Sequence, residues 1–237
     1  TAVKKSLEGI NDTWESKEIK FPMVAAPQVP GKSKVYFYDV PGAKQSVINI
    51  GYPALAATDK DFYPAEVLNY RLGGGGFASQ LTQQLREGKG YTYGIRSSFN
   101  GSNFKGPFMI SSGVRSNVTF ESVELIKEIL NNYGKNFNDE DMEVTKSYLI
   151  KSNARAFETL RSKLGMLSDI SNYSYPNDYA KLNEKIVKDF TVEEIKNMAS
   201  SYLDPNKMIY LIVGDAKTQL KKLEQLGFGA PVLLNKQ

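Results

Sequence analysis

Two side chains that can donate hydrogen bonds to an oxygen atom stand seven residues apart in one glycine-rich segment. Arg86 ends a short run with helical spacing, and Tyr93 stands in the strand-like stretch that follows. A guanidinium offers a fixed fork of donors, and a phenol donates without carrying a charge. Such a pair suits a reaction in which negative charge develops on a substrate oxygen. The spacing alone equally fits an Arg at a helix C-terminus and a Tyr in a half-buried strand.

A run of glycines just before these two residues is the second candidate site. It comprises Gly73, Gly74, Gly75 and Gly76. The spacing Gly73-x-Gly75-x-x-Ala78 matches a loose dinucleotide-binding fingerprint, but that motif needs a strand before the glycines. Here a helical pattern precedes them, which argues against nucleotide binding. The glycines are then either a hinge and a backbone surface for an extended peptide, or a plain loop between helices.

The residue types that are missing exclude several classes of site. The chain of 237 residues contains no histidine and no cysteine. It therefore has no Ser-His-Asp triad, no H-x-x-E-H zinc motif, no thiolate nucleophile and no disulfide. Oxygen ligands alone could hold a metal. The acidic cluster Asp139-Glu140-Asp141 lacks calcium-loop spacing and is interpreted as the start of a helix.

The overall composition is that of a soluble globular protein, with 41% hydrophobic residues, 24% charged residues and a net charge of +4. No basic stripe with interleaved aromatic residues indicates nucleic-acid binding. The longest apolar stretch, 208–213, is too short to cross a bilayer. The first residues carry neither an apolar signal-peptide core nor an initiator Met, so we expect a processed product or a piece of a longer precursor. The compartment, whether cytoplasmic, periplasmic or secreted, stays open.

The order of predicted elements indicates an α+β fold with a mainly antiparallel sheet and helices packed on one face. Strands are expected at 35–38, 46–52, 91–99, 108–114 and 208–213. Helices are expected at about 62–72, 77–88, 117–133, 139–157, 160–173, 191–203 and 218–226. In the second helix, Phe77, Leu81 and Leu85 should form one apolar stripe. In the third strand, Tyr91, Tyr93 and Ile95 should share one face.

The domain organisation predicted from this pattern is simple. Residues 1–34 form a lead-in segment, since Pro22, Pro27, Pro30 and Gly31 prevent a regular element in its second half. No interior linker or short repeat divides the remainder, so residues 35–237 are expected to form a single domain.

The glycine-rich segment resembles the pitrilysin and mitochondrial-processing-peptidase family of zinc metallopeptidases. The matching residues are Leu72 to Gly75, Ser79, Leu81, Arg86, Glu87, Lys89 or Gly90, and Tyr93, with the Arg-to-Tyr offset kept. A second match lies near the C-terminus, at 191–195, 202–208 and 212–215. Two positions depart from the family pattern, because Gln80 replaces a common Arg and Tyr91 a common Leu. The second departure leaves open whether Tyr91 or Tyr93 faces the site.

This resemblance implies a function that is shared between two homologous halves. In family enzymes one half binds zinc and supplies a glutamate base, while the other supplies the Arg and the Tyr. Without an H-x-x-E-H motif, this chain resembles the second, C-terminal half, with the zinc on a partner half or subunit. Arg86 and Tyr93 are then the catalytic residues, and the four glycines and Tyr91 bind the peptide substrate. The chain alone should hold no cofactor and hydrolyse nothing; the alternative is a non-catalytic scaffold or protein-binding module of the same fold.

Overall fold

Apolar residues that alternate with small or polar ones build the strands of a single mixed sheet. The computed structural model describes residues 2–15, 17, 25, 27–155 and 157–234. Its strands are β1 (Lys34–Asp39), β2 (Gln45–Pro53), β3 (Thr92–Phe99), β4 (Pro107–Arg115), β5 (Ile209–Gly214) and β6 (Val232–Leu234). Along β2, Ser46, Ile48 and Ile50 are fully buried, whereas Val47 is 44% exposed. This period of two shows that one face of the sheet is covered and the other is open.

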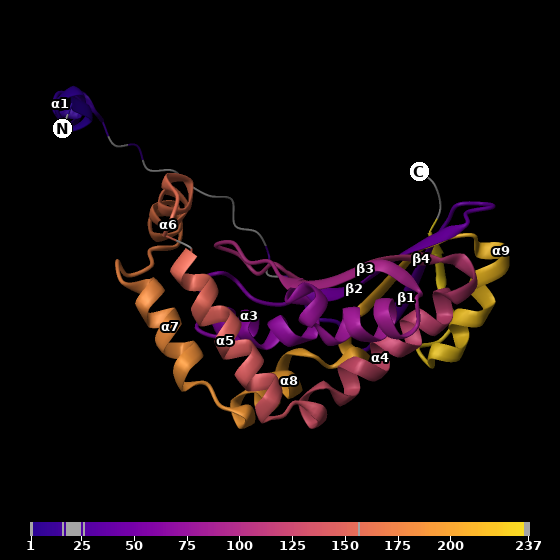
Figure 1. Cartoon of the computed structure of the whole chain (residues 1–237). Helices are drawn as coiled ribbons and strands as arrows, with labels where there is room; N and C mark the ends of the chain where they lie inside the picture. Colours follow the sequence, from indigo (N-terminus) through magenta and orange to yellow (C-terminus); the bar gives the residue numbers. More distant parts are fainter. Residues whose placement is uncertain (1, 16, 18–24, 26, 156, 235–237) are drawn as a thin grey trace.

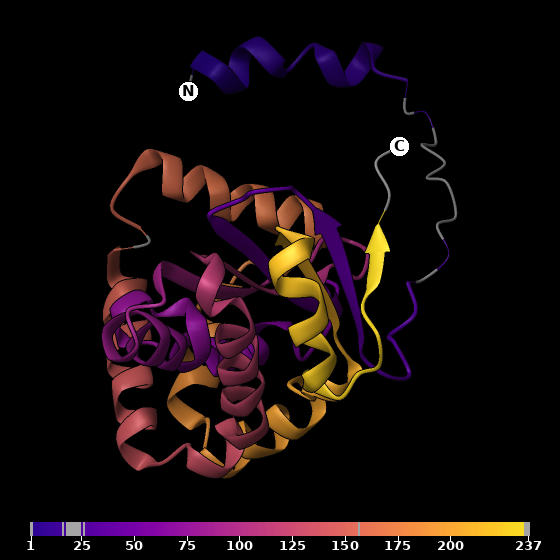
Figure 2. The same cartoon turned by 90° about the vertical axis from the view of Figure 1, so that its right-hand side faces the viewer.

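The strands lie in the order β3-β4-β2-β5-β1-β6, so strands from both ends of the chain meet in the middle of the sheet. The pairs β3–β4, β4–β2 and β2–β5 are antiparallel. Strand β1 instead runs parallel to both β5 and β6. Figure 2 shows the short β6 at the outer edge, next to β1. The predicted antiparallel sheet is therefore correct for the half that carries the candidate site, and the other half is parallel.

Helices cover one face of this sheet, as expected for the α+β class (Figure 1). The helices are α1 (Ala2–Leu7), α2 (Ile10–Thr13), α3 (Phe62–Asn69), α4 (Thr119–Asn136), α5 (Asp139–Arg155), α6 (Leu160–Tyr173), α7 (Tyr179–Asp189), α8 (Val192–Tyr202) and α9 (Ala216–Gln219). The helix α9 continues into a 3₁₀ segment, Leu220–Leu226. The buried Tyr133 of α4 donates a hydrogen bond to the carbonyl oxygen of Leu68 at 2.7 Å. This contact ties α4 to the end of α3 inside the core.

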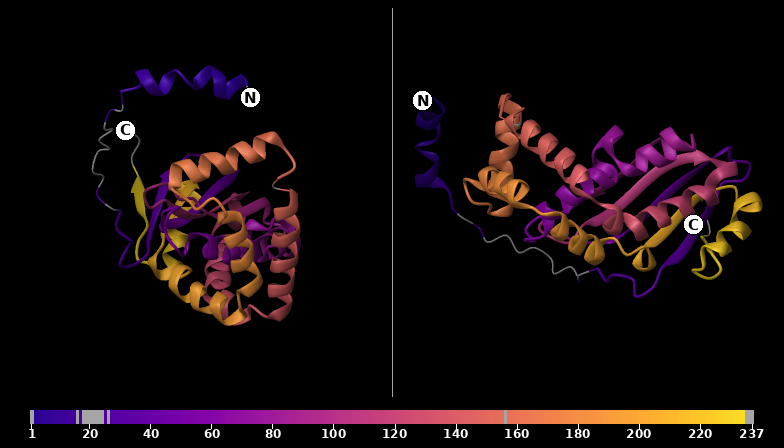
Figure 3. Two further views of the ribbon diagram at one scale, coloured as in Figure 1. Left: turned by 90° about the vertical axis from the view of Figure 1, so that its left-hand side faces the viewer. Right: turned by 60° about the horizontal axis from the view of Figure 1, so that its bottom comes forward.

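The N-terminal region and the two ends of the molecule complete the architecture. Helices α1 and α2 fall within the predicted lead-in, lie apart from the sheet (Figures 1 and 3), and precede β1. Pro22 lies outside the described residues, and the domain boundary at residue 34 stays a prediction. Helices α6 and α7 lie at the opposite end of the molecule from α9.

Within the described ranges, no helix combines the length and apolar character needed to span a membrane.

The glycine run is more ordered than the sequence suggests. Helix α3 continues into a π-helical turn, Tyr70–Gly74, which is followed by a 3₁₀ turn, Gly76–Ala78. The helix expected to end at about residue 72 therefore continues through the first two glycines of the run. Gly73 is accommodated because its Cα hydrogens face β3, where an added Cβ would lie 2.3 Å from Ser97 Oγ. Close packing, rather than looseness, explains this glycine.

Candidate functional site

Arg86 is held at the sheet's edge by the helical turn that contains it. This turn, Thr82–Gly88, is anchored by the fully buried side chains of Leu81 and Leu85. Phe77 was expected in the same apolar stripe, but it is 62% exposed and stacks on the guanidinium of Arg86 at 4.6 Å. On the other side, Arg86 Nε lies 3.4 Å from Glu87 Oε1. The guanidinium is therefore flanked by an aromatic ring and a carboxylate, and its side chain is 38% exposed.

Tyr93 lies on the open face of the sheet because β3 carries an irregularity at this point. The register between β3 and β4 shifts between Thr92 and Ile95. The Thr92 hydroxyl donates to the carbonyl oxygen of Gly113 at 2.7 Å and accepts from Gly94 N–H at 3.0 Å. Thr92 and Ile95 both point into the core, while Tyr93 is 91% exposed. The expectation that Tyr93 and Ile95 share a face is wrong, since a bulge adds one residue and breaks the period of two.

A buried polar contact fixes the far part of β3 against α3. The side chain of Asn69 donates to the carbonyl oxygen of Ser97 at 2.9 Å and accepts from the Ser97 hydroxyl at 2.5 Å. Both side chains are buried. Because unpaired buried polar groups are costly, this pairing fixes the position of β3 relative to the helix that leads into the glycine run. The strand that carries Tyr93 is thereby a rigid support.

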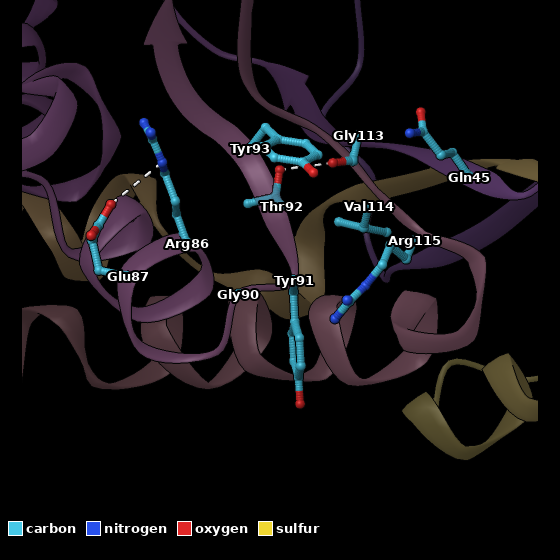
Figure 4. Close-up of a pocket in the computed structure, with 10 residues that line it drawn as sticks. All are labelled: Gln45, Arg86, Glu87, Gly90, Tyr91, Thr92, Tyr93, Gly113, Val114 and Arg115. Atoms are coloured by element: carbon cyan, nitrogen blue, oxygen red, sulfur yellow. Dashed lines mark hydrogen bonds and ion pairs between the residues drawn. The ribbon is translucent and has the colours of Figure 1, made fainter.

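Arg86 and Tyr93 line one cavity of about 380 Å³ (Figure 4). Its lining residues are Gln45, Arg86, Glu87, Gly90, Tyr91, Thr92, Tyr93, Gly113, Val114 and Arg115. They come from the turn Thr82–Gly88, the loop after it, β3, and the paired ends of β2 and β4. The structure thus brings the two predicted catalytic residues to the same hollow. A guanidinium and a phenol around one cavity can donate hydrogen bonds to a carbonyl oxygen or an anion.

Tyr91 also reaches this cavity, but from another direction. In Figure 4 its ring extends away from that of Tyr93. Tyr91 lines a second hollow as well, together with residues of α4 such as Glu124 and Glu128. Of the two tyrosines, Tyr93 is the more exposed and lies on the open face of the sheet. Tyr91 lies at the boundary between the two hollows.

The four glycines lie apart from the cavity lining. An added Cβ at Gly73, Gly74 or Gly75 would lie within 3.0 Å of an atom of Ser97, Asn69 or Tyr70 respectively. Gly76 differs, because it has a φ of +58° and open space around its Cβ position. Packing and backbone conformation account for these residues, and their role in substrate binding stays a prediction.

Two lining residues, Arg115 and Gln45, escaped the sequence analysis. They face each other across the β2–β4 pair, in direct register. Arg115 follows an alternating strand pattern and so looked like an ordinary strand end. Only the pairing of β3 with β4 brings it near Tyr91 and Tyr93. No group of three or more His, Cys, Asp or Glu side chains able to hold a metal occurs in the part of the chain described.

Sequence comparison finds the same type of domain in known proteins. The family model described as the peptidase M16 inactive domain matches residues 1–149. A non-peptidase homolog, YmxG, of Helicobacter pylori is 23% identical over 189 residues, which are 78% of this chain and 42% of that protein. The chain therefore spans less than half the length of this curated relative.

Solved structures agree with the sequence match. A peptidase M16 inactive domain from Pseudomonas fluorescens is 25% identical and has a TM-score of 0.75, over 84% of this chain and 47% of that one. A protease from Helicobacter pylori has a TM-score of 0.76 at 16% identity, over 84% and 48% of the two chains. The second likeness concerns the fold alone. In both cases this chain corresponds to about half of the larger molecule.

Proposed function

The chain belongs to the peptidase M16 inactive-domain family, and from this premise we propose that it lends Arg86 and Tyr93 to a peptide-cleaving site whose zinc lies on another domain or subunit. The family membership confirms the resemblance seen in the glycine-rich segment, and it makes this domain a non-catalytic half within a family of zinc proteases. The catalytic contribution of the two side chains and the identity of the partner are the proposal.

The observation that carries the proposal is that Arg86 and Tyr93 line the same cavity on the open side of the sheet. Hydrolysis of a peptide by zinc-bound water passes through a tetrahedral intermediate with negative charge on the former carbonyl oxygen. Tyr93 can donate a hydrogen bond to that oxygen, and Arg86 can hold a neighbouring carbonyl. Zinc on the partner half would polarise the carbonyl and activate the water.

Because Arg86 and Tyr93 would lie on a different half from the zinc, the site would be complete only when the two halves close over the peptide. With Tyr93 91% exposed, its hydroxyl is solvated until another surface covers it. Covering it excludes water, which strengthens its hydrogen bond to a developing oxyanion. The chain itself has no histidine or cysteine to act as base or nucleophile. It should therefore cleave nothing when it is purified alone.

Reconstitution tests this proposal. The chain is mixed with an M16 half that bears the H-x-x-E-H motif, either encoded in the same gene or beside it, and fluorogenic peptides are supplied. We expect zinc-dependent cleavage only when both halves are present, and chelation should abolish it. A complex that forms stably, binds zinc and still cleaves no member of a broad peptide library would refute the catalytic proposal.

The similarity to a non-peptidase homolog supports a second candidate, a scaffold or protein-binding module of the same fold. In that case the chain would form a stable complex with a partner, and the Arg86→Ala and Tyr93→Phe variants would leave every property of the complex unchanged. The same reconstitution separates the two functions, because only the first predicts that these substitutions reduce turnover.

A further inference from the structure

The cavity contains a second guanidinium that the proposed chemistry does not use. Arg115 ends β4 and lines the cavity together with Arg86 and Tyr91. Among the described residues, no carboxylate lies within 4.0 Å of the Arg115 side chain. The only acidic residue in the lining is Glu87, which lies beside Arg86. The cavity therefore has two positive charges against one negative charge.

Resting on the proposed function, we infer that this cavity binds a carboxylate of the peptide substrate, and that Arg115 supplies the preference for it. The carboxylate could belong to an Asp or Glu side chain or to the C-terminus of the peptide. A guanidinium matches the two oxygens of a carboxylate with two parallel hydrogen bonds. A backbone carbonyl carries no net charge, and Arg86 and Tyr93 already offer donors for it.

The backbone around Arg115 is fixed, so its side chain projects from a defined place. Its residue pairs with Gln45 in the antiparallel register. The next residue, Ser116, donates its N–H to the carbonyl oxygen of Lys44 at 3.0 Å. The Gln45 side chain lines the same cavity and adds an uncharged donor. A carboxylate entering here would meet the Arg115 guanidinium on a fixed backbone, which lowers the ordering cost of binding.

The negative charge of Glu87 does not prevent an anion from binding in the cavity. Its contact with Arg86 is 3.4 Å long, and the two side chains are 38% and 48% exposed. Exposed pairs of this kind are weak. Glu87 therefore offers little repulsion to a substrate carboxylate that pairs with Arg115. The cavity volume of about 380 Å³ also falls in the range of small-ligand sites, about 300–1,000 Å³.

Peptide titrations test this inference on the full chain by NMR of the arginine side-chain N–H groups. Four matched peptides are used, with Glu or Gln at a central position and with a free or an amidated C-terminus. We expect at least one carboxylate to tighten binding by about tenfold over the doubly neutral peptide. The Arg115→Gln variant should lose this preference, whereas Arg96→Gln should keep it. Arg96 is the matched control, because it is an exposed arginine on β3 outside the cavity lining.

The pattern of the four peptides identifies the source of the carboxylate. A gain from Glu with an amidated end indicates an acidic side chain, and a gain from the free end alone indicates C-terminal recognition. Equal binding of all four peptides, no binding of any, or a preference that survives Arg115→Gln would overturn the inference. The proposed function would still stand if Arg86→Ala and Tyr93→Phe reduced turnover of the reconstituted enzyme, so the two can fail separately.

Discussion

The guanidinium Nη2 of Arg71 lies 2.5 Å from Oδ1 of Asp141, and this contact joins the π-helical turn Tyr70–Gly74 to the first turn of α5. The same guanidinium donates to the carbonyl oxygen of Ala78, in the 3₁₀ turn that precedes the helical turn of Arg86. The Arg71 and Asp141 side chains are only 20% and 9% exposed. Arg71 precedes the glycine run and its guanidinium also binds Ala78 after the run, so this ion-paired side chain fixes both ends of the run.

Breaking this pair should destabilise the protein strongly. Asp141→Asn or Arg71→Met leaves one buried charge without its partner, and we expect a loss of about 3 kcal/mol in the free energy of unfolding. Urea denaturation measures it. The exposed pair Lys207–Asp204, with an N–O distance of 3.6 Å, is the control, and removing it should cost below about 1 kcal/mol. Equal effects of the two pairs would contradict the structural role of Arg71.

The glycines of the run should differ in their tolerance of alanine. Gly73→Ala places a Cβ 2.6 Å from Ser97 N, a backbone atom that cannot move freely. Overpacking of this kind costs about 1–3 kcal/mol or more. Gly76→Ala meets no atom within 4 Å and is opposed only by its φ of +58°, a cost of about 1 kcal/mol. Thermal denaturation should rank Gly73→Ala as the more damaging, and the reverse order would contradict the packing described.

Removing the proposed donors should affect turnover rather than folding. In the reconstituted enzyme, Arg86→Ala and Tyr93→Phe should each lower kcat by about 10²-fold, the typical effect of losing one oxyanion donor. Their unfolding curves should match that of the parent, because both side chains lie on the surface. Tyr91→Phe is the companion variant: if it lowers kcat and Tyr93→Phe does not, Tyr91 is the donor. Arg96→Gln should leave kcat unchanged.

A pH-dependent stability is expected from Glu66 on α3. Burial, with a smaller contribution from the Asp169 carboxylate, raises the pKa of Glu66 from 4.5 to about 7. Between these values the folded state keeps a proton that the unfolded state has lost. Stability should therefore fall as the pH rises from about 4.5 to about 7, and then level off. Glu66 is nevertheless exposed at the surface, so screening by water should make this decline smaller than the shift in pKa alone implies.

The Glu66→Gln variant checks this assignment. It keeps the shape of the side chain but cannot ionise, so it should remove the decline in stability between the two pKa values. Denaturation midpoints at several pH values provide the measurement. Glu193, an exposed carboxylate in the first turn of α8, gives the matched control Glu193→Gln. A decline that persists unchanged in Glu66→Gln would assign it to other groups.

Three leucines on α6 should contribute little to stability. Leu160, Leu164 and Leu167 are 85%, 64% and 63% exposed, and α6 has no buried residue. Replacing any one by Ser should change the free energy of unfolding by about 0.5 kcal/mol at most. Leu81→Ala, at a fully buried position, should cost about 2–5 kcal/mol. A large loss at α6 would mean that another surface covers these leucines in solution.

Local signals in the sequence located several elements correctly. The Thr191-to-Glu194 spacing is that of a capping box, and both of its hydrogen bonds are present at the start of α8. Asn138 immediately precedes α5 and is a residue type that caps helices, and its side chain accepts from Asp141 N–H at 3.0 Å. These contacts involve residues three positions apart, so the chain encodes them without reference to the rest of the fold.

Two elements were missed for different reasons. Helix α7 (Tyr179–Asp189) carries apolar residues at helical spacing, Tyr179, Leu182 and Ile186, so a signal was available. Strand β6 has three residues and forms only because β1 lies beside it. No local pattern of that length distinguishes a strand from a loop.

The candidate site shows the same division between local and long-range information. Arg86 and Tyr93 could be selected because they share one short segment with a family resemblance. The orientation of Tyr93 depends on the contact from Thr92 to Gly113, 21 residues away. The place of Arg115 in the cavity depends on the register of β2 and β4. Neither relationship can be deduced before the sheet is known.

The position of β5 between β1 and β2 has a consequence for how the molecule is made on the ribosome. Strand β5 begins at Ile209, so the two strands it separates cannot pair with it until every element from α3 to α8 has been made. Until then, each has an open hydrogen-bonding edge on a nascent polypeptide. Sheets assembled from such distant segments form slowly. We therefore expect the protein to need chaperones, and to be prone to aggregation during expression, until β5 has been made and has paired with β1 and β2.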